Sequence, residues 1–188
     1  MKLVFIRHSK TDRNPKVPFV CWGLAEEGIE LARELSQKAV IKDLDVIYAS
    51  FQTKALETAV ILAKPNAIPI KADNGLTEVT SFTGPFEPDF DRYTKNVHDF
   101  YSDDIDRIAG GETKAEALER FIATLESIAK NESDKELVGI VTHGNILALF
   151  SALYKDVDCY ALHTAIKQPD VAIFSWDEKK FDIFFGEV

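Results

Sequence analysis

Hydrophobic positions along the chain fall into short runs that alternate with longer segments of helical periodicity. The runs at 3–6, 45–50 and 137–142 are each bounded by polar residues, which is typical of strands buried in a parallel sheet. A weaker run at 67–70 indicates a further strand, and the tail 171–185 predicts two strands about a polar turn. These two would form an antiparallel pair at or near the sheet edge.

Apolar residues at helical spacing predict the intervening helices, in the segments 24–39, 55–62, 88–103, 113–128 and 144–154. Ser50 is positioned to cap the second of these, and Pro65 to end it. Thr113 and Glu116 match a capping box. Alternating strands and helices predict an α/β fold: a three-layer sandwich with a mostly parallel central sheet and an antiparallel C-terminal strand or hairpin.

The length and composition fit one domain over 1–188. The chain has 188 residues, 46% of them hydrophobic and 28% charged, which suffices for a substantial core. The region 71–111 is rich in Pro, Gly and Asp with interspersed Phe and Tyr. We expect it to form a lid or side-wall insertion, with the helix at 88–103 inside it.

Charge and cysteine usage exclude several classes of partner. A net charge of −9 argues against nucleic acid and anionic membranes, since both bind basic faces. Cys21 and Cys159 lie far apart without a CxxC pattern, so we expect reduced thiols and no structural zinc. The longest apolar run, 146–154, is too short to span a bilayer, and the first residues lack a signal-peptide core. We therefore expect a cytoplasmic protein.

Two histidines follow buried strands: His8, directly after Arg7, and His143. Ligands of open α/β sheets bind beyond the carboxyl ends of the strands, so neighbouring parallel strands would bring both rings together. Each histidine could instead be a hydrogen-bonded core residue. A phosphate suits the pair better than a metal, because Arg7 would repel a cation and no carboxylate or cysteine stands at ligand spacing. Backbone N–H groups of helices beginning at Gly144 and near Ser50 could add to this anion site.

The motifs around these residues resemble those of the histidine phosphatase superfamily, the phosphoglycerate-mutase-like family. The similar blocks occur in family order over about 3–150: "IRHSKTDRN", "LAEEGIELARELS", "IYASFQTKALETA", "LTEV", "GGET" and "VTHGN". The Gly-rich "AGGETKAE" lacks the spacing of a nucleoside-triphosphate loop.

The resemblance implies a mechanism without metal or organic cofactor. Neutral His8 would attack phosphorus to form a phosphohistidine, and Arg7, Lys54 and His143 would surround the phosphoryl oxygens. Glu78 would protonate the leaving oxygen and later accept a proton from water. Glu87 lies in the same irregular region and is the alternative acid.

Further substrate contacts are implied by the same resemblance. Asn14 would add a hydrogen bond to the phosphoryl group, and Ser9, Thr11 and Gly144 are candidate contacts, although Ser9 and Thr11 could merely cap their loop. His98 and His163 are interpreted as surface or structural, with His163 in an irregular stretch.

Two positions depart from the family pattern. Ser9 replaces the usual Gly after the histidine, which would crowd the site or add a hydroxyl donor. Lys54 replaces the usual second Arg, which keeps the charge but loses the forked donors, so weaker transition-state stabilisation is expected.

The functional hypothesis is a phosphomonoesterase acting on a small phosphorylated metabolite. A mutase is the alternative within the family. A mutase usually has extra active-site segments that keep water from the intermediate, and 188 residues leave little room for them. A phospho-ligand binding or regulatory module with little turnover is a third, motivated by Lys54 and Ser9. The C-terminal hairpin could supply an edge for a homodimer.

Overall fold

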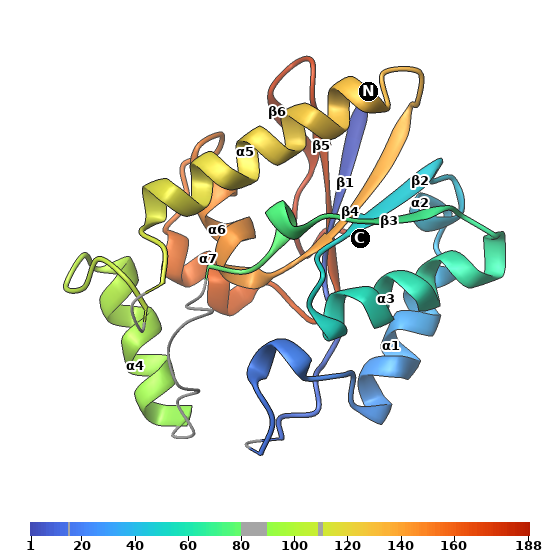
Figure 1. The fold of residues 1–188 in the computed structure, drawn as a ribbon. Coiled ribbons are helices and arrows are strands. Elements are labelled where there is room, and N and C mark those ends of the chain that lie inside the picture. Colours follow the sequence, from blue (N-terminus) through green and yellow to red (C-terminus); the bar gives the residue numbers. More distant parts are fainter. Residues whose placement is uncertain (15, 80–89, 109–110) are drawn as a thin grey trace.

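A six-stranded sheet lies between two layers of helices (Figure 1), in a computed structural model that describes residues 1–14, 16–79, 90–108 and 111–188. The strands are β1 (Lys2–Arg7), β2 (Val46–Ala49), β3 (Ile70–Ala72), β4 (Leu137–Thr142), β5 (Asp170–Ser175) and β6 (Lys180–Ile183). Their order is β3-β2-β4-β1-β5-β6. The first four are mutually parallel, whereas β5 is antiparallel to both β1 and β6. The predicted α/β sandwich, mostly parallel with an antiparallel C-terminal pair, is confirmed.

Helices cover both faces of this sheet. They are α1 (Glu26–Ser36), α2 (Ala39–Lys42), α3 (Thr53–Ala63), α4 (Phe90–Tyr101), α5 (Lys114–Asn131), α6 (Gly144–Ala152) and α7 (Cys159–Ala165), with 3-10 turns η1 (Phe19–Cys21), η2 (Lys64–Asn66) and η3 (Asn74–Leu76). The first three pack on one face, and α5 and α6 on the other, with α4 and α7 beside them. Among the described residues, none of these helices combines the length and apolarity that a bilayer crossing needs.

The alternation of side chains along β1 divides the core in two. Leu3 and Phe5 join the cluster under α5 and α6, whereas Val4 and Ile6 join the cluster under α2 and α3. Since both faces of β1 are buried, its apolar run is continuous instead of alternating with polar residues. The same reason accounts for the run in β4, and the predicted strand at 137–142 matches it.

Aromatic rings fill the larger of the two clusters. The Phe5 ring centroid lies 5.1 Å from that of Phe150, 6.1 Å from that of Phe174 and 6.2 Å from that of Phe121. These rings come from β1, α6, β5 and α5, so the cluster joins the sheet to both helices that cover this face. Tilted arrangements at such separations are favourable for aromatic pairs.

Local predictions hold where they rest on strong patterns. The capping box at Thr113 and Glu116 is present, and α6 is buried over Gly144–Ser151 as its apolar sequence predicts. The helix expected over 88–103 is α4. Part of the region 71–111 lies outside the described residues, so its role as a lid or side wall stays a prediction.

Three local predictions are wrong. Ser50 does not cap α3: the N-cap is Gln52, two residues later, and the Ser50 hydroxyl oxygen accepts a bond from the Gln52 N–H at 3.3 Å. The strand expected at 67–70 begins only at Ile70, because Ala67 adopts a left-handed conformation. His163 lies in helix α7, not in an irregular stretch, and the Asp158 side chain caps that helix by accepting from the Ala161 N–H.

The aromatic cluster predicts a large difference between two Phe-to-Ala changes. Phe5→Ala empties a site that is 0% exposed and should lower the free energy of unfolding by about 3–5 kcal/mol. Phe51→Ala, at a side chain that is 56% exposed, should change it by about 0.5 kcal/mol or less. Urea denaturation followed by circular dichroism compares the two. Equal shifts would contradict this description of the core.

Candidate active site

The two strand-end histidines meet at the carboxyl end of the sheet. In the parallel pairing of β1 with β4, Arg7 stands opposite Thr142, and the His8 N–H donates to the Thr142 carbonyl at 2.9 Å. The next residue on each strand is therefore a histidine, and the ring centroids of His8 and His143 lie 5.1 Å apart. The convergence expected from the sequence is confirmed, and both rings are buried.

The backbone around His8 orients its ring. The Nδ1 atom lies 2.8 Å from the Ser9 carbonyl oxygen, and because that oxygen can only accept, we assign the proton to Nδ1. This leaves the Nε2 lone pair available to attack an electrophile. The Ser9 N–H in turn donates to the Thr58 hydroxyl at 3.0 Å, and that hydroxyl donates to the Lys54 carbonyl at 2.7 Å. Thr58 thus ties the loop after β1 to helix α3.

His143 presents ring nitrogens that have no hydrogen-bond partner among the described residues. Its ring is fully buried, so each unpaired polar nitrogen carries a desolvation penalty of about 1–3 kcal/mol that a ligand could remove. Burial lowers the pKa of His143 well below its ordinary value, and the nearby His8, Lys54 and Arg7 lower it further. Burial, followed by the Lys54 charge, likewise lowers the pKa of His8 well below its ordinary value. Both rings are consequently neutral at pH 7.

Arg7 brings a guanidinium to the same end of the sheet. Its Nη1 donates to the carbonyl oxygens of Ile166, just beyond α7, and of His163, the latter at 3.4 Å. On its other side lies Gly144, where an added Cβ would stand 2.8 Å from the guanidinium carbon. Glycine therefore permits the start of α6 to approach the cation. The guanidinium is thereby held between α6 and α7.

Lys54 is a buried cation in the first turn of α3, only 5% exposed. Its ammonium donates to the Phe19 carbonyl at 3.2 Å and lies 4.5 Å from the centroid of the Phe19 ring. Burial lowers the pKa of Lys54 to about 8, against the opposing effect of the Glu78 carboxylate. The ammonium therefore loses its proton mainly above neutral pH.

Glu78 is buried against the N-terminus of α6. Its Oε2 accepts from the backbone N–H of Asn145 at 3.0 Å and from the Asn145 side-chain amide at 3.2 Å. Its Oε1 accepts from the backbone N–H groups of Ile146 and Val79, both at 2.9 Å. Residues from η3 onward therefore place a carboxylate beside the helix that starts after His143. The alternative acid, Glu87, lies outside the described residues.

The remaining candidate contacts lie in the loop after β1, and the side chains of Ser9 and Asn14 have partners within the protein. The Ser9 hydroxyl donates to the Gly28 carbonyl of α1 at 2.7 Å. Thr11 forms an isolated antiparallel bridge with Leu24. Asn14 is exposed, and its side-chain oxygen accepts from the Lys16 N–H at 3.0 Å. Their role as substrate contacts stays a prediction.

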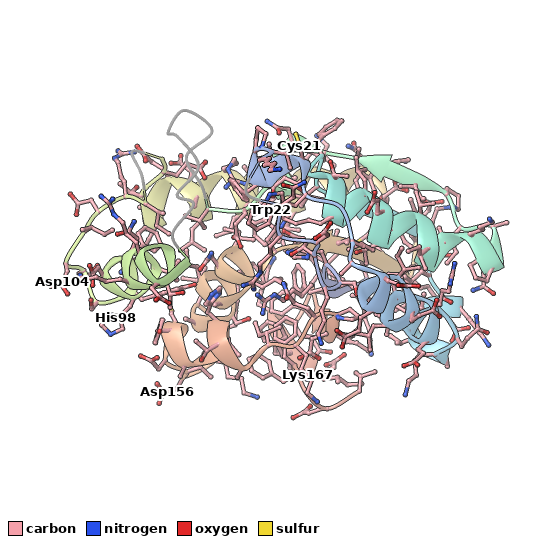
Figure 2. The ribbon with its side chains drawn as sticks, turned by 90° about the horizontal axis from the view of Figure 1, so that it is seen from below. Cys21, Trp22, His98, Asp104, Asp156 and Lys167 are labelled. Carbon is pink, nitrogen blue, oxygen red and sulfur yellow. The ribbon has the colours of Figure 1, made fainter. Side chains whose placement is uncertain are left out.

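Two residues near the site escaped the sequence analysis as contributors to it. Thr58 is hidden in an apolar helix, and nothing in its spacing marks it. His163 is recognisable only once α7 is predicted, for which Asp158 at the N-cap is the available signal. Burial and the Arg7 charge lower the pKa of His163 to about 4. By contrast, His98 of α4 is exposed, with its ring edge-on to Tyr160 of α7, and it lies far from Cys21 and Trp22 of the β1–α1 loop (Figure 2).

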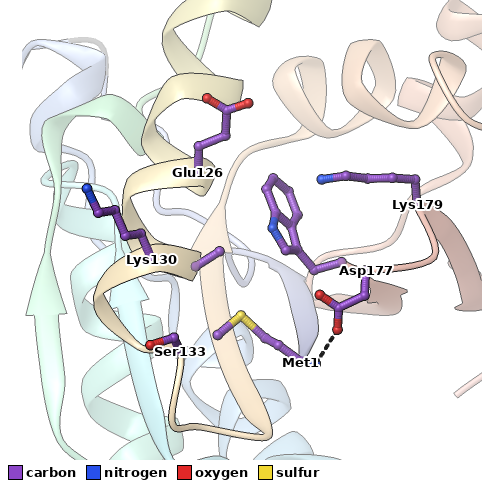
Figure 3. A pocket seen from close by; sticks show the side chains of 8 residues that line it. Met1, Glu126, Lys130, Ser133, Asp177 and Lys179 are labelled. Carbon is purple, nitrogen blue, oxygen red and sulfur yellow. Dashed lines mark hydrogen bonds and ion pairs between the residues drawn. The ribbon is translucent and has the colours of Figure 1, made fainter.

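A depression lies at the opposite end of the strands from His8 (Figure 3). Its volume is about 480 Å³, and Met1, Glu126, Trp176 and Lys179 are among the residues that line it. Because Lys2 pairs with Ser175, this depression adjoins the amino end of β1, away from His8. Among the described residues, no three His, Cys, Asp or Glu side chains are grouped so that they could hold a metal ion.

A family model places these residues in context. The model of the histidine phosphatase superfamily, branch 1, matches residues 3–185. The chain belongs to this superfamily. A search of curated protein sequences gave no match for it.

Solved structures share the fold of this superfamily member over nearly its whole length. Bacillus stearothermophilus YhfR is 25% identical with a TM-score of 0.78, covering 99% of this chain and 96% of its own. A phosphoserine phosphatase from Entamoeba histolytica in complex with 3-phosphoglyceric acid is 21% identical, with a TM-score of 0.76 and coverage of 100% and 97%. A mycobacterial glucosyl-3-phosphoglycerate phosphatase complexed with VO3 is 19% identical, with a TM-score of 0.73 and coverage of 98% and 97%.

The depressed pKa of Lys54 predicts a pH-dependent anion affinity for this superfamily member. As pH rises from 7 to 9.5 the ammonium loses its proton, so the affinity for inorganic phosphate should fall roughly 10-fold, the value of one charged hydrogen bond. Lys54→Arg keeps its charge and should show a much flatter profile. Isothermal titration calorimetry measures both without relying on turnover.

Lys10→Arg is the matched control, because Lys10 is half-exposed and paired with Glu27 outside the site. It should retain the wild-type decline. Parallel profiles for wild type and Lys54→Arg would show that Lys54 does not bind the anion.

Proposed function

We propose that this protein is a metal-independent phosphomonoesterase that hydrolyses a small phosphorylated metabolite through a phosphohistidine on His8. The observation that carries the proposal is the pairing of two buried, neutral imidazoles with two cations, Arg7 and Lys54, near enough to lower the pKa of both rings. Such a group of donors complements a phosphate dianion, whereas the same cations would repel a metal ion. The superfamily membership and the phosphatases among the structural neighbours support the same reaction class.

In the first step, the lone pair on His8 Nε2 attacks phosphorus and the bond from phosphorus to the ester oxygen breaks. Glu78, as the carboxylic acid, gives its proton to that oxygen, so an alcohol leaves. In the second step, water attacks the phosphohistidine, the N–P bond breaks, and the Glu78 carboxylate takes a proton from the water. The products are inorganic phosphate and the starting form of the enzyme.

The groups around the phosphoryl oxygens would stabilise the negative charge of the transferring phosphoryl group. Arg7 is anchored through the carbonyls of His163 and Ile166, so its direction is fixed before a ligand binds. Neither ring nitrogen of His143 has a hydrogen-bond partner in the part of the chain that the structure describes, and the one that carries the hydrogen of the neutral ring would supply a further donor. Donors that are already oriented need little reorganisation as charge develops in the transition state.

A second function, a phospho-ligand binding module with little turnover, is favoured by one observation. The Lys54 ammonium is directed to the Phe19 carbonyl and ring, and it lacks the forked donors of arginine. It could therefore hold an anion without matching a transition state.

Exchange of the nucleophile tests the enzymatic proposal. His8→Ala should lower kcat/KM for 4-nitrophenyl phosphate and for a panel of phosphorylated metabolites by about 10³-fold or more, since no other group replaces the Nε2 lone pair. His98→Ala, at the exposed histidine of α4, is the matched control and should retain wild-type activity. Release of inorganic phosphate between pH 5 and 8 is the measurement.

A wild type that is no faster than His8→Ala on every substrate would overturn the enzymatic proposal and leave the binding module. For an active enzyme, Lys54→Arg separates the two descriptions further. A marked gain in kcat would show that the missing guanidinium limits the rate.

A further inference from the structure

Three successive carbonyl groups precede Glu78, and each accepts a hydrogen bond from a side chain. Arg120 of α5 donates through Nη1 to the Gly75 oxygen at 2.7 Å and to the Thr77 oxygen at 3.1 Å. Between them, the Leu76 oxygen accepts from the Thr142 hydroxyl of β4 at 2.7 Å. The segment 75–77, at the end of η3, is therefore fixed by side chains from two other elements.

Arg120 is itself held in place by a forked ion pair. Its Nε and Nη2 donate to the two carboxylate oxygens of Glu112, each at 2.6 Å. A paired arrangement of this kind fixes the plane of the guanidinium as well as its position. Glu112 belongs to the "GGET" motif, which has no role in the steps of the proposed reaction.

The segment 75–77 packs closely against helix α5 at Gly75. A Cβ added to Gly75 would lie 1.8 Å from the Thr124 hydroxyl oxygen of α5, one helical turn beyond Arg120. The segment thus lies directly on α5. Arg120 also acts on the site at longer range, because its charge helps to lower the pKa of His143.

We infer that Arg120, oriented by Glu112, is a positioning residue that fixes the Glu78 carboxyl for proton transfer to the leaving group. It donates to the carbonyl of Thr77, the residue directly before Glu78. The Glu78 carboxylate accepts from backbone N–H groups at the start of α6. The inference rests on the proposed function, in which Glu78 is the acid. Arg120 would therefore contribute to proton transfer rather than to formation of the N–P bond.

Leaving-group dependence distinguishes this role from a general structural one. 4-Nitrophenolate departs without a proton, whereas the alkoxide of β-glycerophosphate needs one. The measure is kcat/KM, because it reports only the steps through departure of the leaving group, whereas hydrolysis of the phosphohistidine is common to both substrates. Arg120→Gln should lower kcat/KM for β-glycerophosphate by about 10–100-fold, a part of what general acid catalysis supplies, and for 4-nitrophenyl phosphate by less than about 3-fold. Arg107→Gln is the matched control and should change neither value. Arg107 precedes α5 and forms an exposed ion pair with Glu116 of that helix.

A double mutant sharpens the test. Glu78→Gln should show the same selective loss, and adding Arg120→Gln to it should cause little further loss, because both changes impair one proton transfer. Should Arg120→Gln fail to fold, Arg120→Lys keeps the charge beside Glu112 without the forked donors, and it should show the same selectivity between the two substrates.

The possible outcomes distinguish failure of the inference from failure of the proposed phosphomonoesterase function. A wild type no faster than His8→Ala defeats the proposed function, and the inference with it. If Glu78→Gln is selective but the folded Arg120 variants slow both substrates equally, or slow neither, Arg120 does not position the acid. Additive losses in the double mutant would also overturn the inference.

Discussion

The parallel pairing of β1 with β4 is the constraint on which the site depends, because it alone brings His8 beside His143. Both strands are apolar on both faces, so hydrophobicity by itself leaves their register open. Gly139 of β4 pairs with Val4 of β1 and with Ile47 of β2, and a Cβ there would stand 2.9 Å from Leu44 and 3.1 Å from Ile47. This close approach fixes the register of β4 against β2. In the pairing of β4 with β1, a slip of one residue would move His143 from its place beside His8.

Burial determines the electrostatic character of the site. The protein has a net charge of −9, yet two cations meet beside two imidazoles whose pKa values are lowered by desolvation. Carbonyl oxygens at the end of α7 accept hydrogen bonds from the Arg7 guanidinium and so replace part of the solvation that it loses. An arriving anion would thus find positive charge nearby and neutral rings in front of it, the state in which histidine is a nucleophile. Local structure, not overall charge, decides what this surface attracts.

Strand ends were predictable from the sequence, and the loops between them were not. The positions of Arg7, His8 and His143 follow from apolar runs alone, since a parallel sheet places such residues at one edge. Glu78 was assigned by resemblance, and its actual environment depends on long-range bonds from α5, β4 and α6 that no local pattern encodes. Likewise, the Ser9 hydroxyl turns to Gly28 of α1 because tertiary packing, not loop sequence, sets its direction. Helix α7 escaped because seven residues give too short a periodic signal.

The reversed direction of β5 determines which part of the chain stands behind Arg7. Opposite Arg7 is Asp170, the first residue of β5, so the segment entering that strand reaches the carboxyl edge of the sheet. This segment carries the carbonyls of His163 and Ile166 that grip the guanidinium. If β5 ran parallel to β1, the chain leaving β5, and not the chain entering it, would lie beside Arg7. Helix α7, which precedes β5, would then end at the amino edge of the sheet. The polarity of one strand therefore decides whether an arginine at this edge meets oxygen acceptors or none from that helix.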